Sequence, residues 1–269
     1  MRPLLLSACV LLLLNAAPAA AASTPDPLER ARTLYNQRNF DAALEAADDA
    51  ARHTPALAAS ADLIAARAYL EKFRETTSAD DLAHARERLR DIDADHLSAR
   101  ERAELVVGLG EELFFENATG AAADLFDSLL AVPAALSTLD VGARERVLDW
   151  WASALDRDVR PRSDFERQAV YQKIRDRMQL EIGANPGSSA ASYWLSAAAW
   201  GQGDHQAAWD AAQAGWVRAP MTSDHGAALR GDLDRLVQRG IIPERAGALA
   251  QSPDNLQQEW DQFKERWKK

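Results

Sequence analysis

The sequence predicts an all-α protein built from antiparallel helix pairs. From Leu28 onward Ala, Leu, Glu, Arg and Asp dominate, and apolar residues recur at intervals of three and four, which is typical of amphipathic helices. No run of alternating β-branched residues indicates a strand. Short breaker segments separate the helical stretches and predict tight turns; they lie at residues 38–41, 116–120, 160–164, 184–189 and 201–204.

Residues 1–22 are predicted to be a signal peptide. A single early charge, Arg2, precedes an apolar stretch that ends at Leu14, and an Ala-rich cleavage site stands before Ser23, as secretory signals require. The segment Leu6–Cys9 also resembles a lipoprotein box, so lipidation of Cys9 and an uncleaved anchor are the alternatives. We therefore expect an exported protein, periplasmic or secreted, with no integral membrane domain after cleavage.

Cleavage at this site would remove Cys9, the only cysteine of the chain. The mature protein could then form no disulfide and no thiolate metal site. We expect packing alone to hold it together.

A repeating unit is visible near the carboxyl end. Pro186 and Pro220 lie 34 residues apart, and between them runs GSSAASYWLSAAAWGQGDHQAAWDAAQAGWVRAP. Ser196 is a small residue in the first helix, Gly203 belongs to the turn, and Pro220 closes the unit, with small residues at Ala208, Ala212 and Gly215 in the second helix. This stretch resembles a tetratricopeptide repeat, except that His205 stands where an aromatic residue is usual.

The first helix pair shows the same pattern. Ala31 is its small residue, Phe40 is the aromatic residue of the turn, Ala43 and Ala50 lie on the second helix, and Pro55 closes it. Small residues let two helices approach closely, and the proline ends the second helix.

The resemblance implies a right-handed α-solenoid of about five antiparallel helix pairs over residues 23–220. The middle pairs are degenerate, at about residues 56–95, 98–133 and 138–186, with an unusually long helix from about Ser163 to Ile182. Such units cannot bury their apolar faces alone, so stacking must supply the core.

Residues 221–269 are predicted to be a helical cap. We expect one helix from Ser223 to Arg239 with Gly240 as its stop, then a short helix near Pro243, and a last helix that begins after Ser252. The last helix carries an apolar stripe of Leu256, Trp260, Phe263 and Trp267. This stripe covers the end of the solenoid or, alternatively, binds a partner or a membrane surface.

Composition and motifs argue against several function classes. The formal net charge of −10 disfavours nucleic acid as a partner. Neither HExxH nor CxxC occurs, and GxSxG, GxGxxG and phosphate-loop motifs are missing from the sequence. We therefore predict no enzyme activity, no cofactor and no metal site.

In tetratricopeptide repeats the first helices line the inner groove, and this implies a set of partner-binding candidates. They are Arg32, Tyr35, Asn36, Arg67, Phe114, Phe115, Arg157, Tyr193 and Trp200, together with Leu70, Glu71, Glu111, Asp149, Ser153 and Ala197. Aromatic residues and arginines are the common hot spots of interfaces.

Two functions are compatible with these features. The first is a scaffold that binds a protein or peptide partner in its concave groove. The alternative is a small-ligand-binding accessory component of an envelope transport system, since expanded units can enclose a pocket. The sequence identifies neither the partner nor the oligomeric state.

Overall fold

The computed structural model describes residues 26–268, and within them all regular secondary structure is helical. The predicted all-α class is thus confirmed. The predicted signal peptide, its cleavage site and Cys9 lie outside the described residues.

The helices are short to medium in length and follow one another with tight turns. They are α1 (Pro27–Asn36), α2 (Phe40–His53), α3 (Ala58–Thr76), α4 (Ala79–Arg90), α5 (Ala99–Phe115), α6 (Thr119–Leu130), α7 (Pro133–Leu136), α8 (Val141–Val159), α9 (Asp164–Ala184), α10 (Ser189–Gly201), α11 (His205–Arg218), α12 (Ala227–Leu236), α13 (Ile242–Leu249) and α14 (Pro253–Arg266). Three 3₁₀ turns lie at η1 (Pro55–Leu57), η2 (Ala94–His96) and η3 (Ala219–Met221).

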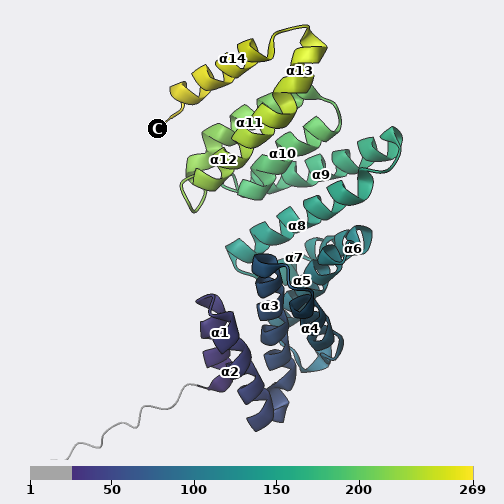
Figure 1. Cartoon of the computed structure of the whole chain (residues 1–269), viewed down its shortest axis with the longest axis vertical. Coiled ribbons are helices and arrows are strands. Elements are labelled where there is room, and N and C mark those ends of the chain that lie inside the picture. Colours follow the sequence, from purple (N-terminus) through teal and green to yellow (C-terminus); the bar gives the residue numbers. More distant parts are fainter. Residues whose placement is uncertain (1–25, 269) are drawn as a thin grey trace, which may run out of the picture.

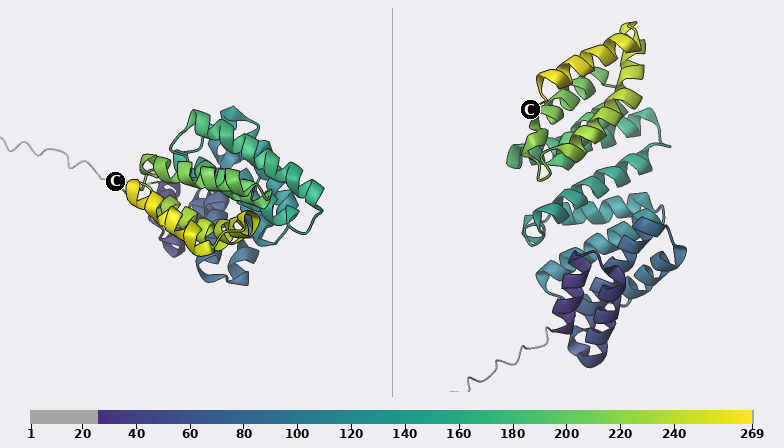
Figure 2. Two further views of the ribbon diagram at one scale, coloured as in Figure 1. Left: turned by 90° about the horizontal axis from the view of Figure 1, so that it is seen from above. Right: turned by 60° about the vertical axis from the view of Figure 1, so that its left-hand side comes forward.

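The helices stack along the long axis of the molecule, with α1 and α2 near one end and α13 and α14 at the other (Figure 1). Helices that are neighbours in sequence pack against each other, as α1 does with α2, α3 with α4, α5 with α6, and α10 with α11. Figure 2 shows the same stack from two further sides.

Small residues allow close helix contacts at the predicted positions. Ala31, Ala43 and Ala208 are fully buried. A Cβ atom at Gly110 on α5 would lie 2.6 Å from the ring of Phe126 on α6, so only glycine allows this approach. Packing of this kind explains why the alanine-rich helices form a core without large aliphatic residues at every contact.

A capping box lies where the sequence predicts the start of the long helix, at about Ser163. Ser163 and Glu166 form a capping box in which the Ser163 hydroxyl donates to Glu166 at 2.6 Å. The long predicted helix therefore begins at Asp164, and it continues to Ala184.

The prediction for residues 223–239 is wrong at both ends. The helix begins at Ala227, where the Asp224 carboxylate accepts from the Ala228 backbone N–H at 2.8 Å. Gly240 does not end it. A π-helical turn (Val237–Ile241), called the π turn below, joins α12 directly to α13.

The apolar stripe of α14 packs against α11. Trp209 and Trp216 lie with their ring centroids 5.6 and 5.5 Å from that of Trp260, and Leu256 and Trp260 are buried. Trp267, at the end of the stripe, is 49% exposed. The first part of the stripe thus serves packing within the chain.

No helix within residues 26–268 is both long and apolar enough to cross a membrane.

Candidate functional site

One row of helices contacts its members in succession along the stack. These contacts join α1 to α3, α3 to α5, α5 to α8, α8 to α10 and α10 to α12. This row, called the inner row because the repeat resemblance implies that these helices line the groove, contains every helix to which the sequence assigned a partner-binding residue. Two hollows lie along it, one near each end.

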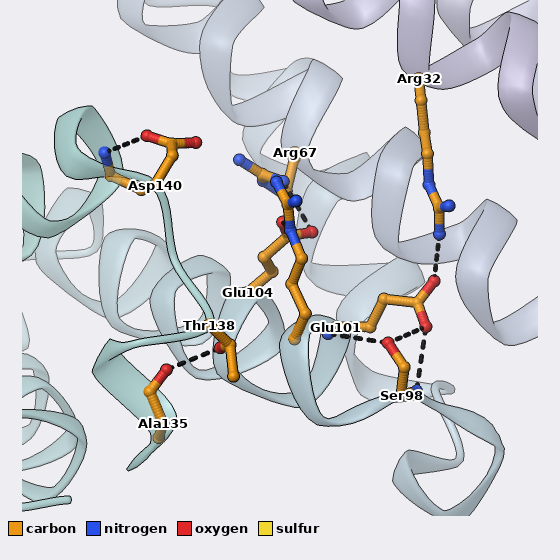
Figure 3. Close-up of polar contacts among 10 residues, drawn as sticks. Arg32, Arg67, Ser98, Glu101, Glu104, Ala135, Thr138 and Asp140 are labelled. Atoms are coloured by element: carbon orange, nitrogen blue, oxygen red, sulfur yellow. Dashed lines mark hydrogen bonds and ion pairs between the residues drawn. The ribbon is translucent and has the colours of Figure 1, made fainter. Parts of the chain in front are cut away.

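The amino-terminal hollow, between α1, α3 and α5, has a volume of about 320 Å³. Arg32 from α1 pairs with Glu101 of α5, and Arg67 from α3 lies 3.0 Å from Glu104 (Figure 3). The guanidinium of Arg67 also lies 4.8 Å from the ring centroid of Tyr35. Most of the charged side chains of this hollow therefore have partners within the hollow itself.

The start of α5 explains how the amino-terminal hollow is built. Ser98 and Glu101 form a capping box, with the Ser98 hydroxyl donating to the Glu101 carboxylate at 2.7 Å. These hydrogen bonds and the charge of Arg32 hold the pKa of Glu101 below its usual range against the opposing effect of burial. The same carboxylate thus caps one helix and ties it to α1.

Between the two hollows lies an aromatic and charged junction. Phe114 and Phe115 of α5 contact the ring of Trp150 at centroid distances of 4.6 and 5.3 Å. The Arg157 guanidinium lies 4.1 Å from the Phe114 ring centroid. Phe114 is only 5% exposed, so its ring supports Arg157 from below rather than forming open surface.

Glu111, also in this junction, is 8% exposed. Burial raises its pKa to about 7, because the positive charges of Arg67, Arg74 and Arg146 only partly offset the loss of water and the nearby charge of Glu71.

The carboxyl-terminal hollow has a volume of about 1110 Å³ and is bounded by α8, α9, α10, α12 and α13. This volume slightly exceeds the usual range for ligand pockets of about 300–1,000 Å³. Arg157, Tyr193 and Trp200 all line it, as do Asp149, Ser153 and Ala197. The six residues assigned to the fourth and fifth predicted pairs therefore come together here.

Aromatic rings form one wall of this hollow. Tyr193 contacts Trp194 edge to face at 5.4 Å, and the Trp194 indole N–H donates to Asp149 at 2.8 Å. Desolvation, together with the carboxylates of Asp232 and Asp149, raises the pKa of Tyr193.

The α8 side chains of the carboxyl-terminal hollow differ in how they are bonded. Glu145 accepts from the backbone N–H of Ala190 at 3.1 Å, which fixes the start of α10. Asp156 accepts from the hydroxyl of Tyr171 at 2.8 Å. Arg146 and Arg157 make no ion pair within the described part of the chain, although both line the hollow. No carboxylate of the described residues therefore pairs with either guanidinium group, although that of Arg157 lies against the Phe114 ring.

The predicted partner-binding candidates thus lie in three places along the inner row, the two hollows and the junction between them. Arg32, Tyr35, Asn36 and Arg67 line the amino-terminal hollow, whereas Arg157, Tyr193 and Trp200 line the carboxyl-terminal one. Phe114 and Phe115 lie in the junction between them. Sequence reasoning missed Arg146, Trp194 and Asp232. Asp232 belongs to α12, which the sequence assigned to the cap, and no local signal relates it to α8.

Within residues 26–268 no group of three or more His, Cys, Asp or Glu side chains is arranged to hold a metal ion. Comparison with models of known protein families and with curated proteins finds no match for this chain. The function of the carboxyl-terminal hollow must therefore be inferred from its geometry and its side chains.

Proposed function

We propose that the chain is an exported, tetratricopeptide-repeat-like scaffold that binds an extended peptide segment of a partner protein. In this proposal residues 23–220 form a right-handed α-solenoid of about five antiparallel helix pairs, and residues 221–269 cap its end. The inner row of helices provides the binding face, and the protein has no catalytic role.

The arrangement of the helices supports the repeat-like fold. Successive first helices, such as α8 and α10, contact each other along the inner row. The small residues of the first and last predicted pairs are buried where helices cross, among them Ala31, Ala43, Ala208 and Ala212. Both features are expected of stacked helix pairs.

The carboxyl-terminal hollow is the observation that carries the proposal. It combines a large volume, aromatic walls at Tyr193 and Trp200, and guanidinium groups without ion-pair partners among the described residues at Arg146 and Arg157. Backbone carbonyls of a peptide could accept hydrogen bonds from these arginines, and its side chains could pack on the rings.

Selection from a phage-displayed library of random peptides tests this function. The bait is the purified protein, and a Ser153→Trp variant is the comparison, because Ser153 lines the hollow and a tryptophan there would fill it. Ser128→Trp is the matched control, since Ser128 is exposed on α6 away from this hollow. We expect peptides that bind the protein and the control but not Ser153→Trp. Equal binding to all three would exclude the hollow as the site.

A small-molecule ligand is the second candidate function, and the volume of about 1110 Å³ favours it. A single drug-sized molecule could be enclosed between α8 and α10. Native mass spectrometry of the protein purified from its own host distinguishes the two functions. A bound small molecule that Ser153→Trp does not retain would favour the ligand-binding component over the scaffold.

Export is the least direct part of the proposal, because it rests on residues 1–22. The intact mass of the protein purified from its host distinguishes the chain cleaved by a signal peptidase from the lipidated chain. A chain that begins at Ser23 supports signal cleavage, and a chain that begins at a lipidated Cys9 supports a membrane-anchored lipoprotein.

A further inference from the structure

The π turn between α12 and α13 lies at the back of the carboxyl-terminal hollow. Leu236 immediately before the turn and Glu244 shortly after it both line this hollow. Pro243 explains why the helix widens here. Proline has no backbone N–H, and its ring would clash with the carbonyl four residues earlier in a regular α-helix.

The π turn also places side chains of α12 and α13 along the same wall of the hollow. Asp232, Leu236 and Glu244 are separated by multiples of four residues, and all three line the hollow. In a continuous α-helix, positions 12 residues apart would differ by about 120° around the axis. A π-helical turn takes about one more residue to close than an α turn, and this brings the α13 side chains back toward the hollow.

Gly240 is buried in the π turn and faces Trp200. A Cβ atom at position 240 would lie 3.0 Å from both Cε2 and Cζ2 of the Trp200 ring, which is closer than the usual carbon–carbon contact of about 3.5–4.0 Å. Trp200 in turn lines the hollow. Its ring therefore lies between the hollow and a backbone segment without a side chain.

Packing alone holds the Trp200 ring in place. Its indole nitrogen is buried and has no hydrogen-bond partner within residues 26–268. No polar contact would therefore resist a shift of the ring if the space beside Gly240 were filled.

We propose that the π turn and Gly240 position the Trp200 ring as a wall of the carboxyl-terminal hollow, which makes Gly240 a positioning residue for peptide binding. This inference rests on the proposed function. An alanine at position 240 would displace the ring toward the hollow and narrow it.

The first test uses the indole ¹H–¹⁵N signals of the protein without ligand. The signal of Trp200 is identified by its loss in Trp200→Phe. We expect Gly240→Ala to shift this signal and Gly231→Ala to leave it in place. Gly231 is the matched control, because it lies on α12, which leads into the π turn, and its Cβ would meet only the flexible end of Arg235, at 3.7 Å. An unmoved Trp200 signal in folded Gly240→Ala would overturn the inference.

The second test measures the affinity of a phage-selected peptide in a double-mutant cycle. We expect Gly240→Ala to weaken binding at least about fivefold when residue 200 is tryptophan, as overpacking would. In the Trp200→Phe background, where the smaller ring leaves room for the methyl group, we expect at most about a twofold loss. Equal losses in both backgrounds would show that Gly240 acts through helix stability alone.

The two proposals fail in different ways. If the library yields no peptide, the proposed function fails, and the indole signals alone still decide whether Gly240 positions Trp200. If peptides bind and Gly240→Ala does not weaken them, the inference is overturned and the proposed function stands.

Discussion

The two hollows of the inner row use similar residues in opposite ways. In the amino-terminal hollow Arg32 and Arg67 form ion pairs with Glu101 and Glu104, so the charges serve to join α1, α3 and α5. In the carboxyl-terminal hollow Arg157 has only the Phe114 ring as a partner among the described residues. An arginine of the inner row therefore indicates a binding site only where no carboxylate of the protein already pairs with it.

Glu101→Ala should have the largest effect on stability. The substitution removes the capping box of α5 and the ion pair with Arg32 together. We expect a loss of about 3 kcal/mol in the free energy of unfolding, measured with urea. Peptide binding at about 25 °C should persist, because the carboxyl-terminal hollow does not contain this residue.

Glu29→Ala is the control for that measurement. Glu29 lines the same hollow but is exposed and makes no ion pair within the described residues. Its replacement should change stability by at most about 0.5 kcal/mol. Equal losses for the two variants would mean that the ion pair and the cap do not hold this end of the stack together.

Glu111→Gln should change how stability depends on pH. The pKa of Glu111 in the folded protein is about 7, raised from 4.5. The contribution of Glu111 to folding stability is therefore fully present below the pKa of this group in the unfolded chain. It is lost as pH rises through the pKa of the group in the folded protein. Because glutamine stays neutral, we expect the variant to be more stable than the wild type by about 2 kcal/mol at about pH 8 and nearly equal at about pH 5.

Urea unfolding at both pH values tests this expectation. Glu87→Gln, which removes an exposed carboxylate on α4, is the control and should leave the pH dependence unchanged. If the stability curves of Glu111→Gln and the wild type run parallel between these two pH values, burial does not keep the Glu111 carboxyl protonated near neutral pH.

Arg67→Ala and Arg157→Ala give the smallest effects and contrast the two hollows directly. Arg67 pairs with Glu104 and stacks on Tyr35, so its loss should cost about 1 kcal/mol of stability and leave peptide affinity unchanged. Arg157→Ala should lower peptide affinity about fivefold with little loss of stability. Calorimetry measures both quantities. If Arg67→Ala lowered peptide affinity and Arg157→Ala lowered stability instead, the amino-terminal hollow would be the binding site.

Features set by local sequence could be predicted, and features set by distant contacts could not. The long helix was predicted to begin at about Ser163, and α9 begins at Asp164, where Ser163 and Glu166 form a capping box from neighbouring residues alone. Glycine is a common helix stop, but Gly240 lies against the ring of Trp200, far earlier in the chain. Contrary to the prediction, the helix continues through Gly240 as a π turn.

The same reasoning applies to the candidate site. The spacing of Arg157, Tyr193 and Trp200 followed from the repeat resemblance, and all three line one hollow. That spacing could not show that Arg67 would be paired with Glu104, since the ion pair depends on how α3 and α5 are placed. It also gave no reason to include Asp232 from the predicted cap.

A crystal structure of the protein with a phage-selected peptide would show which of the two hollows binds it. We predict that the peptide lies between α8, α10 and α12, in contact with Tyr193 and Trp200, while the ion pairs of Arg32 and Arg67 remain intact. A peptide bound in the amino-terminal hollow or on the outer helices would refute the assignment of the binding site to the carboxyl-terminal hollow.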